Sequence, residues 1–319
     1  MDFGFSVPTR GPQATREAIA ALAQAGEKQG YAYVNVNDHI VVPKTIGSTY
    51  PYSEKGDWPG GRFGEALEQL TELAFLAAVT ERIRLLTAVM VVPHRSPVHC
   101  AKILTTIDVL SEGRLTVGCG AGWMKEEFEA LQVPPFEARG RVVDEYLTVF
   151  KKMWTEPAPT VEGEFVCFAN VSVLPLPVQK PHPPLWIGGE SLSALKRAVR
   201  LGEAWFPIGN NPKFPMETAA QYAARLEILK RLLGEAGRDP ATLTLAYAAQ
   251  WSKLGEEVKT AEGGRRLFTG SAEAILDDIG RFGELGVRHL LLNFQSRDLS
   301  ETLDKMQAFT DQVMSKAAA

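Results

Sequence analysis

Hydrophobic residues are distributed along this chain as short continuous runs, separated by longer stretches in which they recur every three or four positions. The short runs lack strict alternation of polar and apolar residues, which is typical of strands buried on both faces. Eight such runs follow one another, so we predict eight strands. They cover residues 2–7, 31–36, 83–90, 115–119, 184–188, 204–208, 243–248 and 289–294.

The intervening stretches have the period of amphipathic helices. Pro97 after Ser96 fits the start of a helix, and Gly202 and Gly286 fit helix ends. Strands that alternate with helices in this way form a parallel sheet with the helices outside it. Apolar residues share one face at Phe63, Leu67, Leu70, Ala74 and Ala77 in the second helical stretch, and at Leu299, Leu303, Met306, Phe309 and Val313 in the last.

The fold class is therefore α/β, and eight βα units without a linker predict a single domain over residues 1–319, a (β/α)8 TIM-like barrel. Three segments are longer than a minimal connection. Residues 37–62 and 251–270 follow strands, so we expect them to roof a pocket at the carboxyl ends of the strands. Residues 160–174 are expected to form a small inserted β-hairpin with a structural role.

Composition narrows the classes of partner. Hydrophobic residues make up 45% and charged residues 23%, and the formal net charge of −4 provides no basic surface for nucleic acid. No apolar run is long enough to span a bilayer and the first residues carry no charged leader, so a cytoplasmic location is expected. Three cysteines without metal-ligand spacing predict neither a metal site nor a disulfide framework. Small residues at Ala74, Ala77 and Ala78 are compatible with a homodimer, and the sequence leaves the oligomeric state open.

The first candidate for chemistry is Asn37-Asp38-His39, which closes the second predicted strand. Barrel enzymes place catalytic groups at this end of their strands, and histidine is the side chain best suited to exchange a proton near neutral pH. His39 is therefore a candidate general acid or base, with Asp38 setting its position. The alternative is that both are polar residues that cap a turn.

A second candidate is the run from Gly118 to Trp123, which closes the fourth strand. Residues two apart in a strand share a face, so Gly118, Gly120 and Gly122 would remove side chains from that face and open a slot for a flat ring. The spacing is not that of a dinucleotide-binding fingerprint. The alternative is that the glycines mark a bend of the barrel over which Trp123 packs.

A third candidate is Gly188-Gly189-Glu190-Ser191, which closes the fifth strand and opens a helix. Backbone amides at a helix start form a natural cradle for an anion, and glycines allow it to approach closely. Glu190 would repel a phosphate unless its side chain turned outward. A Ser-capped helix without any ligand is the alternative.

Taken in order, several segments resemble the bacterial-luciferase-like monooxygenase superfamily, in particular its deazaflavin-dependent (coenzyme F-420) branch. The resemblance covers nearly the whole chain. It is carried by Asn37-Asp38-His39, by residues 83–98 with Pro93-His94-Arg95-Ser96-Pro97-Val98 at their end, by residues 107–115, by residues 118–128, and by Pro181-His182-Pro183-Pro184-Leu185-Trp186-Ile187-Gly188-Gly189.

The resemblance implies a flavin or deazaflavin that lies across the strand ends. A non-proline cis peptide after the third strand would support the ring, and it corresponds here to Ala88-Val89, next to Thr87. The implied residues are His39 and Asp38 for proton handling and ring contact, and Trp123 for the substrate side. The implied cofactor contacts are Asp38, Thr87, Ala88, Val89, Gly120, Gly122, Gly188, Gly189, Glu190 and Ser191.

The leading hypothesis is hydride transfer between reduced coenzyme F-420 and a small organic substrate, with the cofactor supplying the redox chemistry. The first alternative is a monooxygenase that uses reduced FMN and molecular oxygen, because both cofactors share a tricyclic ring and a first phosphate. A flavin-binding protein without turnover is an alternative from another class. The sequence does not identify the substrate.

Overall fold

The computed structural model describes residues 1–317, and its central element is a closed barrel of eight parallel strands. Neighbouring strands pair in the order β3-β2-β1-β13-β10-β9-β8-β5, and pairing of β3 with β5 closes the circle. The predicted α/β barrel is confirmed. Its strands are β1 (Asp2–Ser6), β2 (Tyr33–Val36), β3 (Arg84–Thr87), β5 (Leu115–Gly120), β8 (Leu185–Gly188), β9 (Ala204–Phe206), β10 (Thr244–Ala249) and β13 (Val287–Leu292), with β4 (Met90–Val91) continuing β3.

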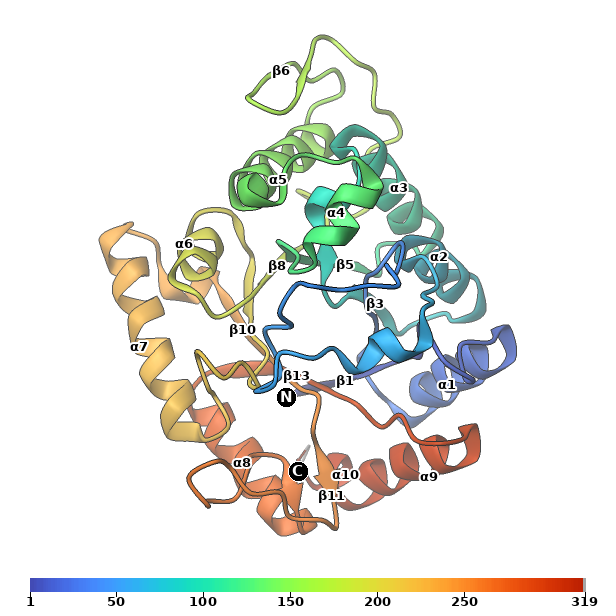
Figure 1. The fold of residues 1–319 in the computed structure, drawn as a ribbon, viewed down its shortest axis with the longest axis vertical. Helices are drawn as coiled ribbons and strands as arrows, with labels where there is room; N and C mark the ends of the chain where they lie inside the picture. The colour runs from blue at the N-terminus through green and yellow to red at the C-terminus, as the bar shows by residue number, and fades with distance from the viewer. Residues whose placement is uncertain (318–319) are drawn as a thin grey trace.

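Helices surround the barrel on its outer side (Figure 1). Several begin at side-chain caps, such as Thr15 before α1, Ser191 before α6 and Ser271 before α8. The helices are α1 (Arg16–Gln29), α2 (Gln69–Val79), α3 (Pro97–Leu110), α4 (Lys125–Leu131), α5 (Arg139–Thr155), α6 (Leu192–Leu201), α7 (Ala219–Glu235), α8 (Ala272–Glu284) and α9 (Leu299–Phe309), followed by a π-helical turn (Thr310–Met314) and α10 (Ser315–Ala317).

The predicted second helix starts later than its hydrophobic pattern indicates. The segment Pro59–Phe63 is a 3-10 turn, and α2 begins only at Gln69 because the carboxylate of Glu68 caps it, accepting from the Thr71 amide at 2.7 Å. Leu67 is 39% exposed and does not join the core. The assignment of Phe63 and Leu67 to the helix face is therefore wrong, and the side chain of Phe63 lies outside the described part.

The core has two layers, because successive side chains of a barrel strand point alternately inward and outward. The outer layer fills the space between strands and helices with large side chains such as Trp154 and Phe150. The inner layer closes the barrel below the carboxyl ends of its strands. It consists of Tyr33, Leu86, Trp186, Ala204, Phe206, Ala246, Ala248 and Leu291.

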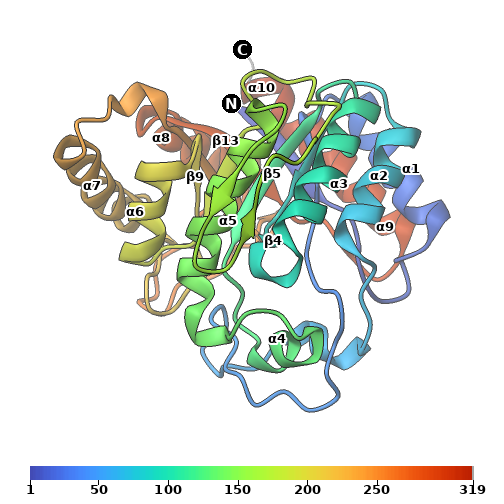
Figure 2. The same ribbon diagram turned by 90° about the horizontal axis from the view of Figure 1, so that it is seen from above.

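Two additions distinguish the two ends of the barrel. The long segment after β2 and the short helix α4 cover one end, while both chain termini lie toward the other (Figure 2). The predicted hairpin is present as the antiparallel pair β6 (Val161–Glu162) and β7 (Cys167–Phe168), which projects beyond α5 (Figure 1). A further small sheet pairs β11 (Lys253–Leu254) with β12 (Thr269–Gly270). Among the described residues, no helix has the length and apolarity needed to cross a membrane.

Candidate active site

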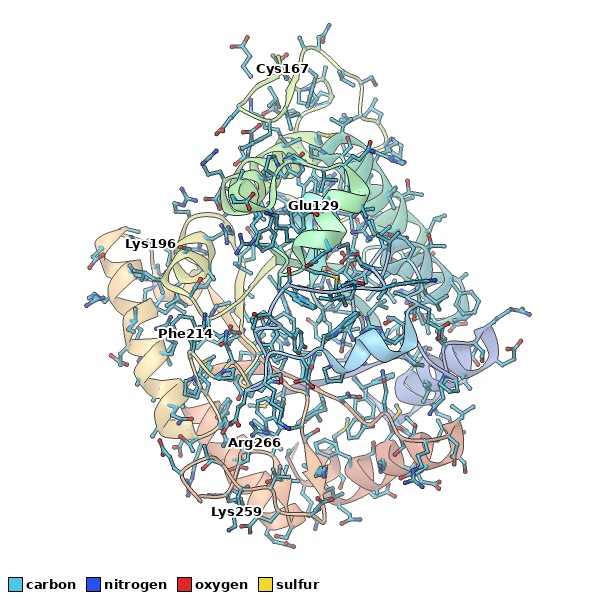
Figure 3. The ribbon with its side chains drawn as sticks, in the orientation of Figure 1. Glu129, Cys167, Lys196, Phe214, Lys259 and Arg266 are labelled. Carbon is cyan, nitrogen blue, oxygen red and sulfur yellow. The ribbon has the colours of Figure 1, made fainter. Side chains whose placement is uncertain are left out.

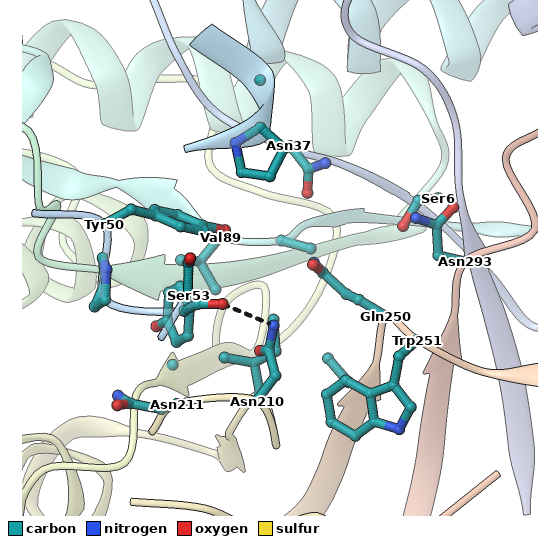
Figure 4. Close-up of a pocket in the computed structure, with 18 of the residues that line it drawn as sticks. Ser6, Asn37, Tyr50, Ser53, Val89, Asn210, Asn211, Gln250, Trp251 and Asn293 are labelled. Carbon is teal, nitrogen blue, oxygen red and sulfur yellow. Dashed lines mark hydrogen bonds between the residues drawn. The ribbon is translucent and has the colours of Figure 1, made fainter. Parts of the chain in front are cut away.

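A cavity of about 1290 Å³ opens at the carboxyl ends of the barrel strands (Figure 4). Both long segments that were expected to roof a pocket contribute to it, 37–62 through Trp58 and 251–270 through Trp251. The structure brings almost all of the predicted site residues to this one cavity. Its lining includes Asp38, His39, Ala88, Val89, Gly120, Gly122, Trp123, Gly188, Gly189, Glu190 and Ser191.

Thr87 is the predicted residue that does not line the cavity. Its side chain is fully buried, and its hydroxyl donates to the backbone carbonyl of Gly118 at 2.8 Å. This bond ties β3 to β5 inside the barrel wall. The expectation that Thr87 contacts a cofactor is corrected accordingly.

The peptide between Ala88 and Val89 is cis, as predicted, and it separates β3 from β4. The glycines of β5 and β8 make room for this bulge. A Cβ on Gly120 would lie 2.5 Å from Val89 Cγ2, and one on Gly188 would lie 2.9 Å from Val89 Cγ1. The slot expected along Gly118, Gly120 and Gly122 is not open, because atoms of Thr87, Val89 and Val91 occupy the space in front of the three glycines. Val89 itself forms part of the cavity surface.

His39 is held by a residue that sequence reasoning missed. Its Nδ1 lies 2.7 Å from Oε2 of Glu127 in α4, and the Glu127 carboxylate is completely buried. The other Glu127 oxygen accepts from the amides of Ile40 and Val41. Burial acts to raise the pKa of Glu127, but the hydrogen bond and charge of His39, together with His94, outweigh it and lower that pKa.

This geometry leaves Nε2 as the ring nitrogen of His39 that is not engaged by Glu127. The ring is 7% exposed, lines the cavity and packs against Trp58 with centroids 4.4 Å apart. An ionised carboxylate at Nδ1 fixes the orientation of an imidazole and favours a proton on that nitrogen. His39 is therefore set to exchange a proton with a molecule in the cavity through Nε2.

Asp38 does not orient His39, which corrects the sequence prediction. Its carboxylate receives two hydrogen bonds of 2.8 Å from Arg95 and one of 2.8 Å from the Val91 amide. Burial acts to raise the pKa of Asp38, but the Arg95 charge and hydrogen bonds outweigh it and lower the pKa. Asp38 lines the cavity while both of its oxygens hold the loop after β4 in place.

The turn from β8 into α6 brings glycine backbone and the start of a helix to the cavity. Gly189 adopts a φ of +101°, and the Ser191 hydroxyl caps α6 by accepting from the Ala194 amide at 3.2 Å. Glu190 turns toward β9, where its carboxylate accepts from the Ile208 amide and from Asn211, each at 2.9 Å. Burial raises the pKa of Glu190 to about 7. The Glu190 carboxylate therefore points away from the turn, and its raised pKa lowers the fraction that carries a negative charge near neutral pH.

Aromatic side chains cover the cavity between β2 and α4. Trp123 meets Tyr50 at 5.0 Å and Trp58 at 5.7 Å between ring centroids, and the Arg10 guanidinium lies 4.8 Å from the Trp58 centroid. Glu126, the neighbour of Glu127, holds the covering segment by accepting from the amides of Gly47 and Ser48 and from the Ser48 hydroxyl.

The opposite rim is formed by residues that come from β9 and from the segment after β10. Phe214 and Arg266 lie on this side of the molecule, whereas Cys167 lies on the distant hairpin (Figure 3). Arg266 is paired with Glu217, and its guanidinium stacks over Trp251 at 4.6 Å from the ring centroid. The positive charge at this rim is therefore already compensated.

Together, the closed barrel, the strand-end cavity and the carboxylate-held imidazole define a TIM-like barrel enzyme. The sequence model of the family described as Luciferase-like monooxygenase matches residues 1–252, so the chain belongs to this family. It is an oxidoreductase of the flavin- or deazaflavin-dependent kind.

Relatives of known sequence agree with this assignment. The chain is 28% identical over 300 residues to an uncharacterized protein of Mycobacterium tuberculosis. This match covers 94% of the chain and 93% of that protein. It is 35% identical over 146 residues to an FMNH(2)-dependent dimethylsulfone monooxygenase of Pseudomonas putida, but this match covers 45% of the chain and 40% of that protein.

Solved structures share the fold over the whole chain. A monooxygenase from Streptomyces bottropensis superposes with a TM-score of 0.76 at 21% identity, covering 99% of both chains. A coenzyme F420-dependent tetrahydromethanopterin reductase from Methanopyrus kandleri superposes with a TM-score of 0.75 at 16% identity, again over 99% of both chains. Proteins that use FMNH2 and proteins that use F420 are thus both similar to this chain.

Proposed function

We propose that this protein transfers a hydride between a reduced deazaflavin of the F420 type and a small organic substrate, with His39 exchanging the accompanying proton. The observation that carries the proposal is the contact of 2.7 Å between His39 Nδ1 and the buried carboxylate of Glu127. Oxidation of an alcohol carbon releases a hydride and a proton together, and reduction of a carbonyl consumes both. A single oriented acid–base group next to the hydride acceptor meets that requirement.

The residues of the cavity fit such a cofactor. Val89 presents a side chain at the cavity surface against which a flat ring can lie, and the β8 turn at Gly188 and Gly189 offers glycine backbone, next to the start of α6, to a phosphate. When bound, the deazaflavin would supply hydride chemistry. One strand, β5, lies between these two features, since it separates β3 from β8 in the sheet.

The protein's own contribution is orientation, exclusion of water and proton exchange. Glu127 holds the His39 ring, and the roof residues Trp58 and Trp123 shield it from bulk solvent. In the direction of reduction, His39 donates a proton from Nε2 to the oxygen of a carbonyl. In the direction of oxidation, the same nitrogen accepts the hydroxyl proton.

A second candidate function is monooxygenation with reduced FMN and molecular oxygen. It is favoured by the 35% identity of part of the chain to the Pseudomonas putida FMNH(2)-dependent enzyme. The two functions share the cavity and His39, and they differ in whether oxygen is consumed.

The test is a titration of the apoprotein with F420 and with FMN under reducing, anaerobic conditions, followed by oxygen-uptake measurements. The proposal expects F420 to bind with micromolar or better affinity and turnover to proceed without oxygen uptake. Tight FMN binding with no F420 binding, accompanied by oxygen consumption, would replace the first function by the second.

A further inference from the structure

The half of the cavity that lies away from the β8 turn ends in uncharged amides. Asn37 is the first residue after β2, Gln250 the first after β10 and Asn293 the first after β13, and all three line the cavity. Ser6 at the end of β1 and Asn210 after β9 continue the series. We call Ser6, Asn37, Asn210, Gln250 and Asn293 the amide floor.

Apart from Asn210, which follows β9 next to β8, the amide floor lies away from the turn assigned to the phosphate. Along the closed barrel, β1 is four strands from β8 in either direction, and β13 and β10 lie between β1 and β9. A cofactor that extends from the β8 turn across Val89 would therefore leave the β10, β13 and β1 side for a second molecule. The cavity volume of about 1290 Å³ exceeds the range of about 300–1,000 Å³ that a typical ligand site occupies, so it has room for both.

The floor presents hydrogen-bond donors and acceptors without net charge. Asn293 uses its Oδ1 to accept from the Gln295 amide, which leaves its NH2 group available. Asn210 donates to the Tyr52 carbonyl at 3.3 Å, and its own Oδ1 is buried without a partner among the described residues. Figure 4 shows the side-chain ends of Asn37 and Gln250 approaching the same space from opposite sides.

The charged groups around this half are engaged elsewhere or lie at the outer edge. Arg266 is paired with Glu217, and Glu190 is bound to Asn211. Four more charged residues of the lining, Glu54, Lys55, Glu262 and Arg297, are exposed. A buried ligand charge without a counter-charge costs several kcal/mol, so the floor disfavours both carboxylates and amines.

Three lining cations, Arg10, Lys55 and Arg297, form no ion pair within residues 1–317. Lys55 and Arg297 are exposed, whereas the Arg10 guanidinium lies over Trp58. Its Nε and Nη2 are shielded from solvent and have no hydrogen-bond partner among the described residues. Burial lowers the pKa of Arg10, while nearby Tyr50, Glu127 and Glu72 oppose that shift. Arg10 stacks on the Trp58 side of the cavity and is not part of the amide floor.

An aromatic wall adjoins the floor. Trp251 stands beside Gln250 in the lining, and its indole NH donates to the Leu267 carbonyl at 3.0 Å, which fixes the ring (Figure 4). Aromatic faces bind flat or ring-shaped molecules, and amides bind oxygens at their edges. The combination suits a ring with polar substituents.

We propose that the substrate is an uncharged cyclic molecule that carries several hydroxyl or carbonyl oxygens, held by the amide floor and Trp251. This inference rests on the proposed function, because one of those oxygens belongs to the reacting carbon. In the reduction, the carbonyl carbon receives the hydride of the reduced deazaflavin, the C=O π bond becomes a C–O single bond, and the oxygen receives the proton from His39. Carbohydrate rings and hydroxylated aromatic ketones share this chemistry.

The test measures binding by quenching of tryptophan fluorescence in the protein without added cofactor. Four probes are compared: methyl glucoside and 5-hydroxy-1,4-naphthoquinone as neutral oxygenated rings, 1-naphthoate as an anion, and 1-naphthylmethylammonium as a cation. We expect at least one neutral probe to bind about tenfold or more tightly than both ions, and the first two probes distinguish a carbohydrate from an aromatic substrate. Equal or tighter binding of either ion would overturn the proposal.

Variants connect the preference to the floor. Gln250→Leu and Asn293→Leu should each weaken the neutral probe about tenfold, whereas Gln307→Leu on the exposed side of α9 should leave binding unchanged. Gln250→Glu keeps the shape and should shift the preference toward 1-naphthylmethylammonium. Unchanged probe affinities in both leucine variants would reject the floor as the substrate site.

A parallel F420 titration of the same variants separates the two proposals. Normal F420 binding with altered probe binding supports the floor as a substrate site. Loss of F420 binding in the leucine variants would show that the floor holds the cofactor and would overturn this inference. If wild-type protein binds no F420 while the probe preferences hold, the proposed function fails and the substrate chemistry stands.

Discussion

Glu127 and His39 are joined by a buried contact of 2.7 Å although 88 positions separate them in the sequence. The carboxylate comes from α4, and the imidazole comes from the loop after β2. The same carboxylate also accepts the amides of Ile40 and Val41. Glu127 therefore acts as a positioning residue for the one imidazole that lines the cavity among the described residues.

Replacing Glu127 by Gln should lower kcat about tenfold to a hundredfold and change KM little. The neutral amide keeps the size of the side chain but no longer fixes the proton on His39 Nδ1, and oriented acid–base catalysis contributes about 10²–10⁴ to a rate. Steady-state kinetics with the substrate found by the binding screen checks this. A kcat equal to that of the wild type would show that Glu127 has no role in proton transfer.

Arg95→Met should destabilise the protein by about 3–5 kcal/mol, because it leaves the fully buried Asp38 carboxylate without its counter-charge. Urea denaturation measures the change in free energy of unfolding. The double variant Arg95→Met with Asp38→Asn should recover part of the loss. Arg82→Met, in a pair whose arginine side chain is 70% exposed, serves as the matched control and should cost less than about 1 kcal/mol.

Glu72 should make stability fall as the pH rises. Burial raises its pKa to about 8, with Arg10 opposing the shift, and neither of its oxygens has a hydrogen-bond partner in the part of the chain that the structure describes. Between the ordinary value of 4.5 and about 8, the folded state keeps a proton that the unfolded state has lost. The free energy of unfolding then falls by up to about 1.4 kcal/mol per pH unit across this window.

The comparison with Glu72→Gln isolates this effect, since every other titrating group is common to both proteins. In urea denaturation, we expect the free energy of unfolding of the variant to rise steadily relative to that of the wild type from pH 5 to pH 8. Above that range the difference should stay constant. A difference between the two proteins that stays constant with pH would contradict the role of Glu72.

Gly120→Ala should destabilise the protein and deform the cavity, because its Cβ would lie 2.5 Å from Val89 Cγ2. Adding Val89→Ala should relieve the clash and restore much of the stability. The control is Gly280→Ala in α8, where a Cβ would meet nothing within 4 Å. This substitution should stabilise the protein by about 0.5–1 kcal/mol. Thermal unfolding compares the three variants, and a Gly120→Ala protein as stable as the wild type would show that Val89 moves freely.

The barrel could be predicted from sequence because its signal is repeated eight times and each repeat is local. The strand ends are predictable for the same reason, so the pattern assigns His39 and Gly188 to one cavity, whereas Val89 is assigned to it only through the resemblance to the family. The partner of His39 could not be predicted in this way. Asp38 is adjacent in sequence, yet its side chain points toward Arg95, since neighbouring residues at a strand end face different directions.

Glu127 escaped prediction for a related reason. A glutamate within Lys125-Glu126-Glu127-Phe128 looks like part of a solvated charged face, and only tertiary packing shows that this side chain is buried. The prediction that α2 begins before residue 69 is wrong for a similar reason. Leu67 continues the helical spacing of apolar residues, but the Glu68 side chain caps the helix and so sets its start at Gln69. Periodicity reports which residues can share a face, whereas caps and buried charges depend on contacts with distant segments.

Two adjacent glutamates at the start of α4 have different tasks, since Glu126 holds the covering segment at Gly47 and Ser48 and Glu127 holds His39. Both contacts depend on the placement of this one short helix, so the seating of the roof and the aim of the imidazole are coupled through two consecutive positions of the chain.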